Sequence, residues 1–173
     1  MKRSVVVLAL SALAFVAMCY MAVRAFWRPG LPRRAEQILA RPAELSLLSL
    51  DPGRGRARPG EDQFHGWRLL GKTSVTDARQ QAALVAAVER GISHVNARSL
   101  CFEPRHGLEA RSPAGAVDLV ICYHCDVIQV YVDGQKVDEL LTRDSGQAFL
   151  DGMLGAAHIP LGHYIGERAG AAQ

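Results

Sequence analysis

The sequence predicts an α+β domain whose mainly antiparallel sheet carries two helices on one face, preceded by an N-terminal transmembrane helix. Three observations lead to this prediction. Hairpin signals separate β-like runs, two segments have the capped periodicity of helices, and the twenty residues from 4 to 23 carry no charge. With 173 residues, of which 49% are hydrophobic, the chain can form one core and one appendage.

The uncharged run at residues 4–23 is long enough for a helix to cross a hydrocarbon layer of about 30 Å. Arg24 stands where a cleavable signal peptide would need a small residue, so an uncleaved anchor is favoured. We therefore expect a single-pass membrane protein, anchored in the lipid bilayer by residues 1–24. Lys2 and Arg3 precede the run and more arginines follow it, so the side of the membrane stays undecided.

The next part of the chain, residues 25–62, is expected to be a Pro/Arg-rich linker. Five of the eight prolines lie there, and proline interrupts both helices and sheet ladders. The linker divides the anchor from a small α+β domain at residues 63–160, which a C-terminal tail at 161–173 follows. Removing residues 1–60 should then leave a soluble domain.

The expected domain alternates strands with two helices. The strand 67–75 leads into a helix that Ser74 or Thr76 caps and Gly91 ends. Hairpins are expected around Gly115 and at Asp133-Gly134, the strongest hairpin signal in the chain. The strands that these turns join are expected at residues 106–111, 116–123, 127–132 and 135–139. A last helix is expected to follow Ser145.

The charge distribution argues against a nucleic-acid partner. Residues 61–173 carry ten basic and fourteen acidic side chains, so the excess of positive charge belongs to the N-terminal third. Phosphate-backbone binding depends on clustered lysine and arginine within the folded part. We therefore expect no nucleic acid among the partners.

One segment matches a phosphate-binding loop by its letters alone. Residues 66–73, GWRLLGKT, fit the pattern G-x-x-x-x-G-K-[ST]. Such a loop needs a preceding buried strand and small, flexible residues, but residues 60–65 are polar and the middle of the segment is bulky. The context therefore predicts no nucleotide binding and makes Lys72 a solvated strand residue.

Two segments carry the remaining chemistry: residues 101–108, CFEPRHGL, and residues 117–125, VDLVICYHC. They resemble the CFxPRHG and VDLVICxxC segments of an uncharacterised family of small bacterial proteins. The resemblance covers about residues 63–160, most of the expected domain. It implies no activity and assigns no catalytic residue.

The spacing of Cys122 and Cys125 is that of a metal knuckle or a redox pair. A zinc site would need two more ligands, which Cys101 and His106 could supply, with His124 as an alternative ligand. Two other interpretations remain: a disulfide between two of the three cysteines, and burial of the thiols in the core. Thiol-redox chemistry is less favoured, because both flanks of the pair are β-like and no helix begins there.

The sequence identifies no nucleophile and base, no carboxylate pair and no fitting glycine-rich cradle, so it favours a non-catalytic protein. We expect a membrane-anchored structural or ligand-binding module. A zinc-binding domain is the alternative, a thiol-redox protein follows it, and no protein partner is indicated.

Overall fold

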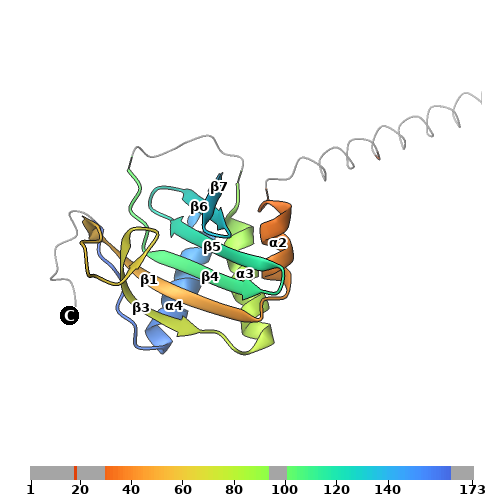
Figure 1. Ribbon diagram of the computed structural model, residues 1–173, viewed down its shortest axis with the longest axis horizontal. Coiled ribbons are helices and arrows are strands. Elements are labelled where there is room, and N and C mark those ends of the chain that lie inside the picture. The colour runs from red at the N-terminus through yellow and green to blue at the C-terminus, as the bar shows by residue number, and fades with distance from the viewer. Residues whose placement is uncertain (1–17, 19–29, 94–100, 165–173) are drawn as a thin grey trace, which may run out of the picture.

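The computed structural model describes Met18, residues 30–93 and residues 101–164 (Figure 1). Apart from Met18, the predicted anchor at residues 1–24 lies outside these residues, as do positions 165–173 of the predicted tail. Within the described ranges, none of the helices has the length and apolar character needed to cross a membrane.

The described chain is an α+β fold built on one curled antiparallel sheet, which confirms the predicted fold class in its coarse form. Seven strands lie side by side in the order β2-β3-β1-β4-β5-β6-β7 (Figure 1). Their bounds are β1 Glu44–Arg56, β2 Gln63–Phe64, β3 Trp67–Ser74, β4 His106–Ser112, β5 Gly115–Cys122, β6 Val127–Val132 and β7 Gln135–Leu141. The strand β1 therefore lies between β3 and β4, which follow it in sequence.

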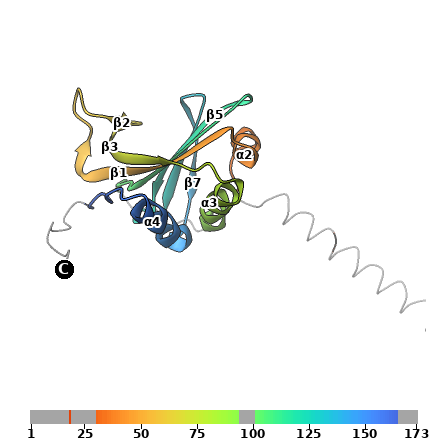
Figure 2. The same ribbon diagram turned by 90° about the horizontal axis from the view of Figure 1, so that it is seen from below.

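Three α-helices, one more than predicted, cover one face of the sheet, as the view from below shows (Figure 2). They are α2 Arg33–Ala40, α3 Ala78–Gly91 and α4 Gln147–Ala156, with a short 3₁₀ turn η1 Asp144–Gly146 before α4. Asp77, rather than Ser74 or Thr76, caps α3, because its carboxylate accepts the Gln80 backbone N–H at 2.9 Å.

The main core lies between the helices and the sheet. Alternate residues of β1, such as Leu45 and Leu47, point toward the helices and are almost fully buried. From the helices, Ile38 of α2, Leu84 of α3 and Leu150 of α4 meet them without any exposed area. Burial of side chains of this size stabilises a fold by about 1.5 to 3 kcal/mol each.

Among the described residues, no helix lies on the opposite face of the sheet, and we call this the helix-free face. Leu48, Leu50 and Val120 form a second apolar cluster there with two aromatic residues, Phe64 and Trp67. The segment after β1 folds back over this face, and Phe64 lies directly above Gly107. A Cβ at position 107 would be only 2.9 Å from the Phe64 ring, so the close packing depends on that glycine.

The predicted linker needs correction, because residues 33–56 form α2 and the central strand β1. The prolines of this part lie where each can be accommodated: Pro32 is the N-cap of α2, and Pro52 lies at an irregularity of β1. Regular pairing of β1 with β3 is interrupted between Asp51 and Arg56, so Pro52 removes no hydrogen bond from an intact ladder. Composition alone made this stretch resemble a linker.

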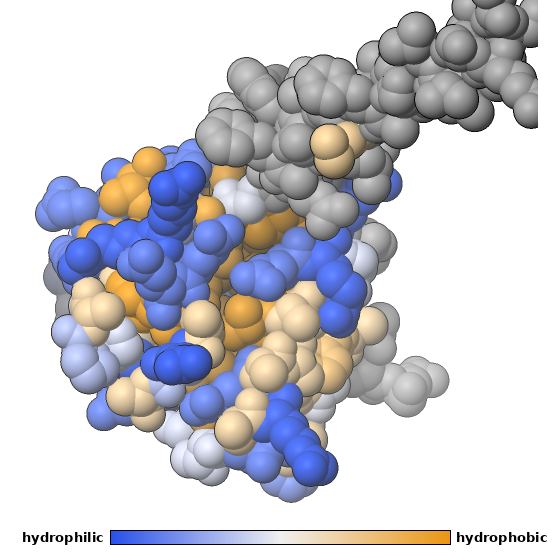
Figure 3. Space-filling view, turned by 90° about the vertical axis from the view of Figure 1, so that its right-hand side faces the viewer, coloured by the Kyte–Doolittle hydropathy of each residue, from blue (hydrophilic) through white to orange (hydrophobic). Residues whose placement is uncertain are grey.

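Both predicted hairpins are confirmed. β4 and β5 pair in register from His106↔Ile121 to Ser112↔Gly115, and Asp133-Gly134 joins β6 to β7 with positive φ at both turn residues. Hydrophilic and hydrophobic residues are interspersed on the side of the molecule seen in Figure 3.

We predict that deleting residues 1–60 abolishes cooperative folding, whereas deleting residues 1–29 preserves it. The longer deletion removes β1, so β3 and β4 lose their common partner and the core loses Leu45 and Leu47. Circular dichroism and urea unfolding of the two deletion variants measure the difference. Cooperative unfolding of residues 61–173 alone would show that the sheet does not depend on β1.

Candidate functional site

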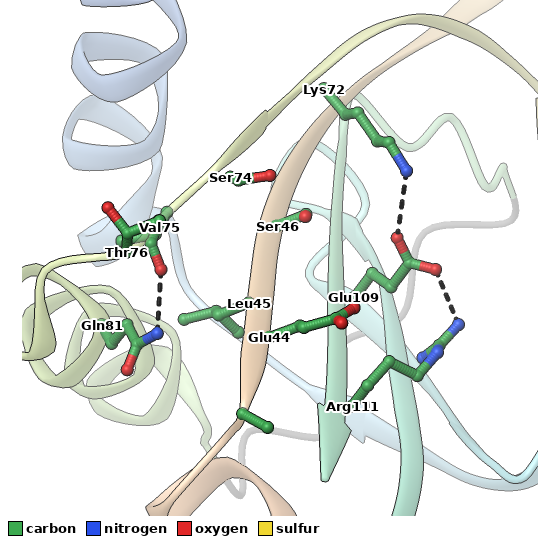
Figure 4. Close-up of a pocket in the computed structure, with 11 residues that line it drawn as sticks. Glu44, Leu45, Ser46, Lys72, Ser74, Val75, Thr76, Gln81, Glu109 and Arg111 are labelled. Carbon is green, nitrogen blue, oxygen red and sulfur yellow. Dashed lines mark hydrogen bonds and ion pairs between the residues drawn. The ribbon is translucent and has the colours of Figure 1, made fainter.

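A polar cavity of about 420 Å³ lies where β1 begins and β3 and β4 end (Figure 4). In Figure 4, Lys72, Glu109 and Arg111 lie on one side of it, Gln81 and Thr76 lie on the other, and serines lie between them. Its full lining is Ala43, Glu44, Leu45, Ser46, Lys72, Ser74, Val75, Thr76, Gln81, Glu109 and Arg111. The volume falls within the range of ligand pockets, about 300 to 1,000 Å³.

Strand register brings these side chains together. Ser46 of β1 is paired with Ser74 of β3 on one side and with Glu109 of β4 on the other. Side chains two residues apart on a strand share a face, so Lys72 lies on the same face as Ser74, and Arg111 on the same face as Glu109. Leu48, which is paired with Lys72, belongs to the apolar cluster of the helix-free face. The polar lining therefore continues that face.

Charged groups form an alternating chain across the helix-free face. The Lys72 Nζ atom lies 3.7 Å from Glu109, and the other Glu109 oxygen accepts a hydrogen bond from Arg111 at 2.7 Å. Arg111 also donates to Asp118 at 2.5 Å, and the other oxygen of Asp118 is 2.8 Å from His65 Nε2. The carboxylates thus alternate with basic groups, as partly buried charges require.

Asp118 is the most buried member of this chain, with 8% of the residue exposed. Burial by itself raises the pKa of its carboxyl group. Hydrogen bonds from His65 and Arg111, and their positive charges, outweigh the burial and lower the pKa below its ordinary value. The His65 ring is held in place by stacking on Tyr131, with ring centroids 3.7 Å apart.

Several polar groups of the cavity keep hydrogen-bonding capacity. Within the residues that the structure describes, no side-chain hydrogen bond or ion pair engages the hydroxyls of Ser46 and Ser74 or the carboxylate of Glu44. Lys72 is 3.7 Å from its partner, too far for a hydrogen bond, and its side chain is 56% exposed. The cavity therefore presents an ammonium, two hydroxyls and a carboxylate that a ligand could bind.

Two of the residues predicted as metal ligands are joined covalently. Cys122 and Cys125 form a disulfide across the β5–β6 turn, with Cα atoms 5.2 Å apart, and both residues are fully buried. Each sulfur accepts a backbone hydrogen bond: the Cys125 N–H donates to Cys122 at 3.0 Å, and the Glu103 N–H donates to Cys125 at 3.2 Å. The segment before β4 is thereby held against this turn.

The other predicted ligands do not join this pair. His106 is paired with Ile121 and points toward the helices, where its Nε2 lies 2.7 Å from Asp151 of α4. Cys122 follows the alternation of Asp118 and Val120, which places its side chain on the opposite face of β5.

Cys101 and His124, the remaining candidates, are both exposed. Residues 30–93 and 101–164 contain no group of three or more His, Cys, Asp or Glu side chains placed to hold a metal. A disulfide offers no thiolate ligand, so the predicted zinc site, Cys101, His106, Cys122 and Cys125 with His124 as alternative, stays a prediction for the reduced protein.

The cavity residues on β1 were not among the predicted site residues, because that strand lay within the predicted linker. A signal was present: Leu45, Leu47 and Leu48 alternate partly with Glu44 and Ser46, as in a half-buried strand. The phosphate-loop-like residues 67–73 lie within strand β3 and not in a loop before a helix. The absence of nucleotide binding remains a prediction.

We predict that acid destabilises the fold in part through Asp118. The pKa of this group is lowered in the folded state, so its contribution is complete above its unfolded pKa, about 3.9, and is lost as the pH falls through the lowered folded value. Asp118→Asn should cost about 1 to 3 kcal/mol near pH 6 and reduce the loss of stability between about pH 6 and pH 3.

Urea unfolding of the wild type and of Asp118→Asn at both pH values provides the measurement. Asp62→Asn, at an exposed position, is the matched control and should keep the pH dependence of the wild type. An identical pH dependence in the wild type and Asp118→Asn would contradict the assignment.

We also predict that the disulfide stabilises the domain. Replacing Cys122 and Cys125 together by alanine should lower the free energy of unfolding by about 2 kcal/mol, the chain-entropy value for so short a loop. Urea unfolding measures this loss. Cys101→Ala, at an exposed position outside the disulfide, should change the stability by less than about 0.5 kcal/mol. A double variant as stable as the wild type would argue against this role.

A scan of protein-family models found none that matches the chain. Searches of curated proteins and of solved structures likewise returned no match. The geometry of the cavity and of the cysteine pair is therefore the basis of the functional proposal.

Proposed function

We propose that the folded part of this protein is a non-catalytic module that binds a small polar ligand in the cavity between β1, β3 and β4. The observation that carries the proposal is the convergence on one cavity of polar groups that the described residues leave available, those of Lys72, Ser46, Ser74 and Glu44. The proposal includes a membrane anchor at residues 1–24, which rests on the uncharged run of the sequence.

The composition of the cavity supports binding rather than catalysis. Its lining contains no histidine and no cysteine, so neither Ser46 nor Ser74 has an imidazole beside it in the lining to act as a general base. Glu109 is held between Lys72 and Arg111, which fixes the position of its carboxylate as a hydrogen-bond acceptor. Fixed polar groups that converge in one cavity are typical of recognition sites.

A metal-binding or thiol-redox role is the second candidate, and the cysteine pair favours it. Backbone N–H groups donate to both sulfurs, an arrangement that would also stabilise thiolates after reduction. Both sulfurs are buried, however, which restricts the approach of an external thiol. Binding of one zinc ion per chain by the reduced protein, lost when both cysteines are replaced, would favour this candidate.

The ligand-binding proposal is tested by a titration with candidate ligands and by a variant whose side chain fills the cavity. The ¹⁵N-labelled full chain is titrated in detergent with a panel of amino acids, short peptides, sugars, carboxylates and inorganic phosphate. We expect at least one compound to shift the resonances of Lys72 and Ser46. Ser74→Phe should weaken its affinity at least tenfold, because the added ring occupies the cavity.

Gln135→Phe is the matched control. Gln135 is exposed at the start of β7, at the opposite edge of the sheet from the cavity, so this variant should bind like the wild type. The proposal fails if no compound of the panel perturbs the lining residues, or if Ser74→Phe binds as tightly as the wild type.

A further inference from the structure

We propose that the ligand of this cavity is a short peptide with both ends free, whose carboxylate binds Lys72 and whose ammonium binds Glu44. This inference rests on the proposed ligand-binding function and names its ligand class. Lys72 on β3 and Glu44 at the start of β1 are both lining residues with polar groups available.

Charge balance favours a ligand whose net charge is zero. The charged lining residues are Lys72, Arg111, Glu44 and Glu109, whose charges cancel, and Asp118 adds a negative charge behind Arg111. A phosphate dianion would bring excess negative charge to a site that already holds carboxylates. A zwitterion can satisfy the local charge at each end without changing the total.

The carboxylate end of the peptide fits the β3 side of the cavity. Lys72 offers an ammonium that no hydrogen bond to Glu109 occupies, because the two atoms are 3.7 Å apart. The Ser46 and Ser74 hydroxyls, on directly paired residues of β1 and β3, can donate to the same carboxylate. Arg111 is less available, since it already donates to both Glu109 and Asp118.

The ammonium end fits Glu44. Its carboxylate is the member of the lining that no ion pair within the described chain neutralises, whereas Glu109 lies between two cations. Arg111 is paired with Glu44 across β1 and β4, but its guanidinium is turned to Glu109 and Asp118. A ligand ammonium would supply the missing positive charge.

Strand geometry sets the length of the ligand. Lys72 is paired with Leu48, and Glu44 lies four residues before Leu48 on the same strand. Four residues of a strand span about 13 Å between Cα atoms. An extended tripeptide spans about 10 Å, and the long Lys72 and Glu44 side chains can cover the difference. The spacing of the strand positions is therefore compatible with a ligand of tripeptide length.

The test uses triglycine as the probe, with two analogues that each lack one charge. N-acetyl-triglycine lacks the ammonium, and triglycinamide lacks the carboxylate. Titration of the full chain in detergent, followed by calorimetry and by the resonances of the lining residues, gives the affinities. We expect each analogue to bind at least tenfold more weakly than triglycine, since it leaves one charged group of the cavity without a partner.

Two variants assign the ends of the peptide. Lys72→Gln should weaken triglycine about tenfold but leave the affinity of triglycinamide unchanged, because this analogue has no carboxylate to lose. Glu44→Gln should weaken triglycine but leave N-acetyl-triglycine unchanged. Lys136→Gln is the matched control, since Lys136 is an exposed lysine of β7 that pairs with Glu139. This control should bind all three probes like the wild type.

The possible outcomes separate the two proposals. Equal affinities for triglycine and both analogues, or tight binding of inorganic phosphate or a sugar in place of triglycine, would overturn the peptide inference and leave the ligand-binding function standing. No binding of any probe at the lining residues would overturn both. Unchanged triglycine binding by Lys72→Gln and Glu44→Gln would overturn the assignment of the two ends.

Discussion

The pairing of β1 with both β3 and β4 is the constraint on which the rest of the structure depends. These two strands are separated in sequence by the whole of α3 and meet only through β1. Alternation along β1 directs Leu45 and Leu47 to the helices, and Glu44 and Ser46 to the helix-free face. One strand thus contributes to the core and also lines the cavity, so the stability of the fold and the shape of the cavity both depend on it.

Placing all three helices on one face leaves the other face to be completed without them. Phe64 and Trp67 cover the apolar part of the helix-free face, with Phe64 seated on Gly107. The rest of this face carries the chain of alternating charges that runs from Lys72 to His65. Each partly buried carboxylate there has a basic group beside it, which compensates the cost of its burial.

The local signals in the sequence predicted local structure well. Asp133-Gly134 defines its hairpin because both residues accept positive φ. The residue periodicity of α3 and β3 is likewise visible without knowing which distant segments pack against them. The linker prediction failed because it treated prolines as breaks wherever they occur. Pro32 at a helix start and Pro52 at an interruption of pairing are compatible with regular elements, which becomes visible only when the neighbouring strands are known.

The candidate site shows the same limit more sharply. The spacing of Cys122 and Cys125 indicated their proximity, because three residues suffice to close a turn. His106 does not join these two cysteines, although it lies near them in the sequence of strands. Its position on β4 directs its ring to the helix side of the sheet. The cavity joins Lys72, Glu44 and Glu109 through pairings between strands far apart in sequence. The role of a charged residue on a strand can therefore be assigned only when the register of that strand is known. Here the pairing with β1 sets the register of β3 and β4.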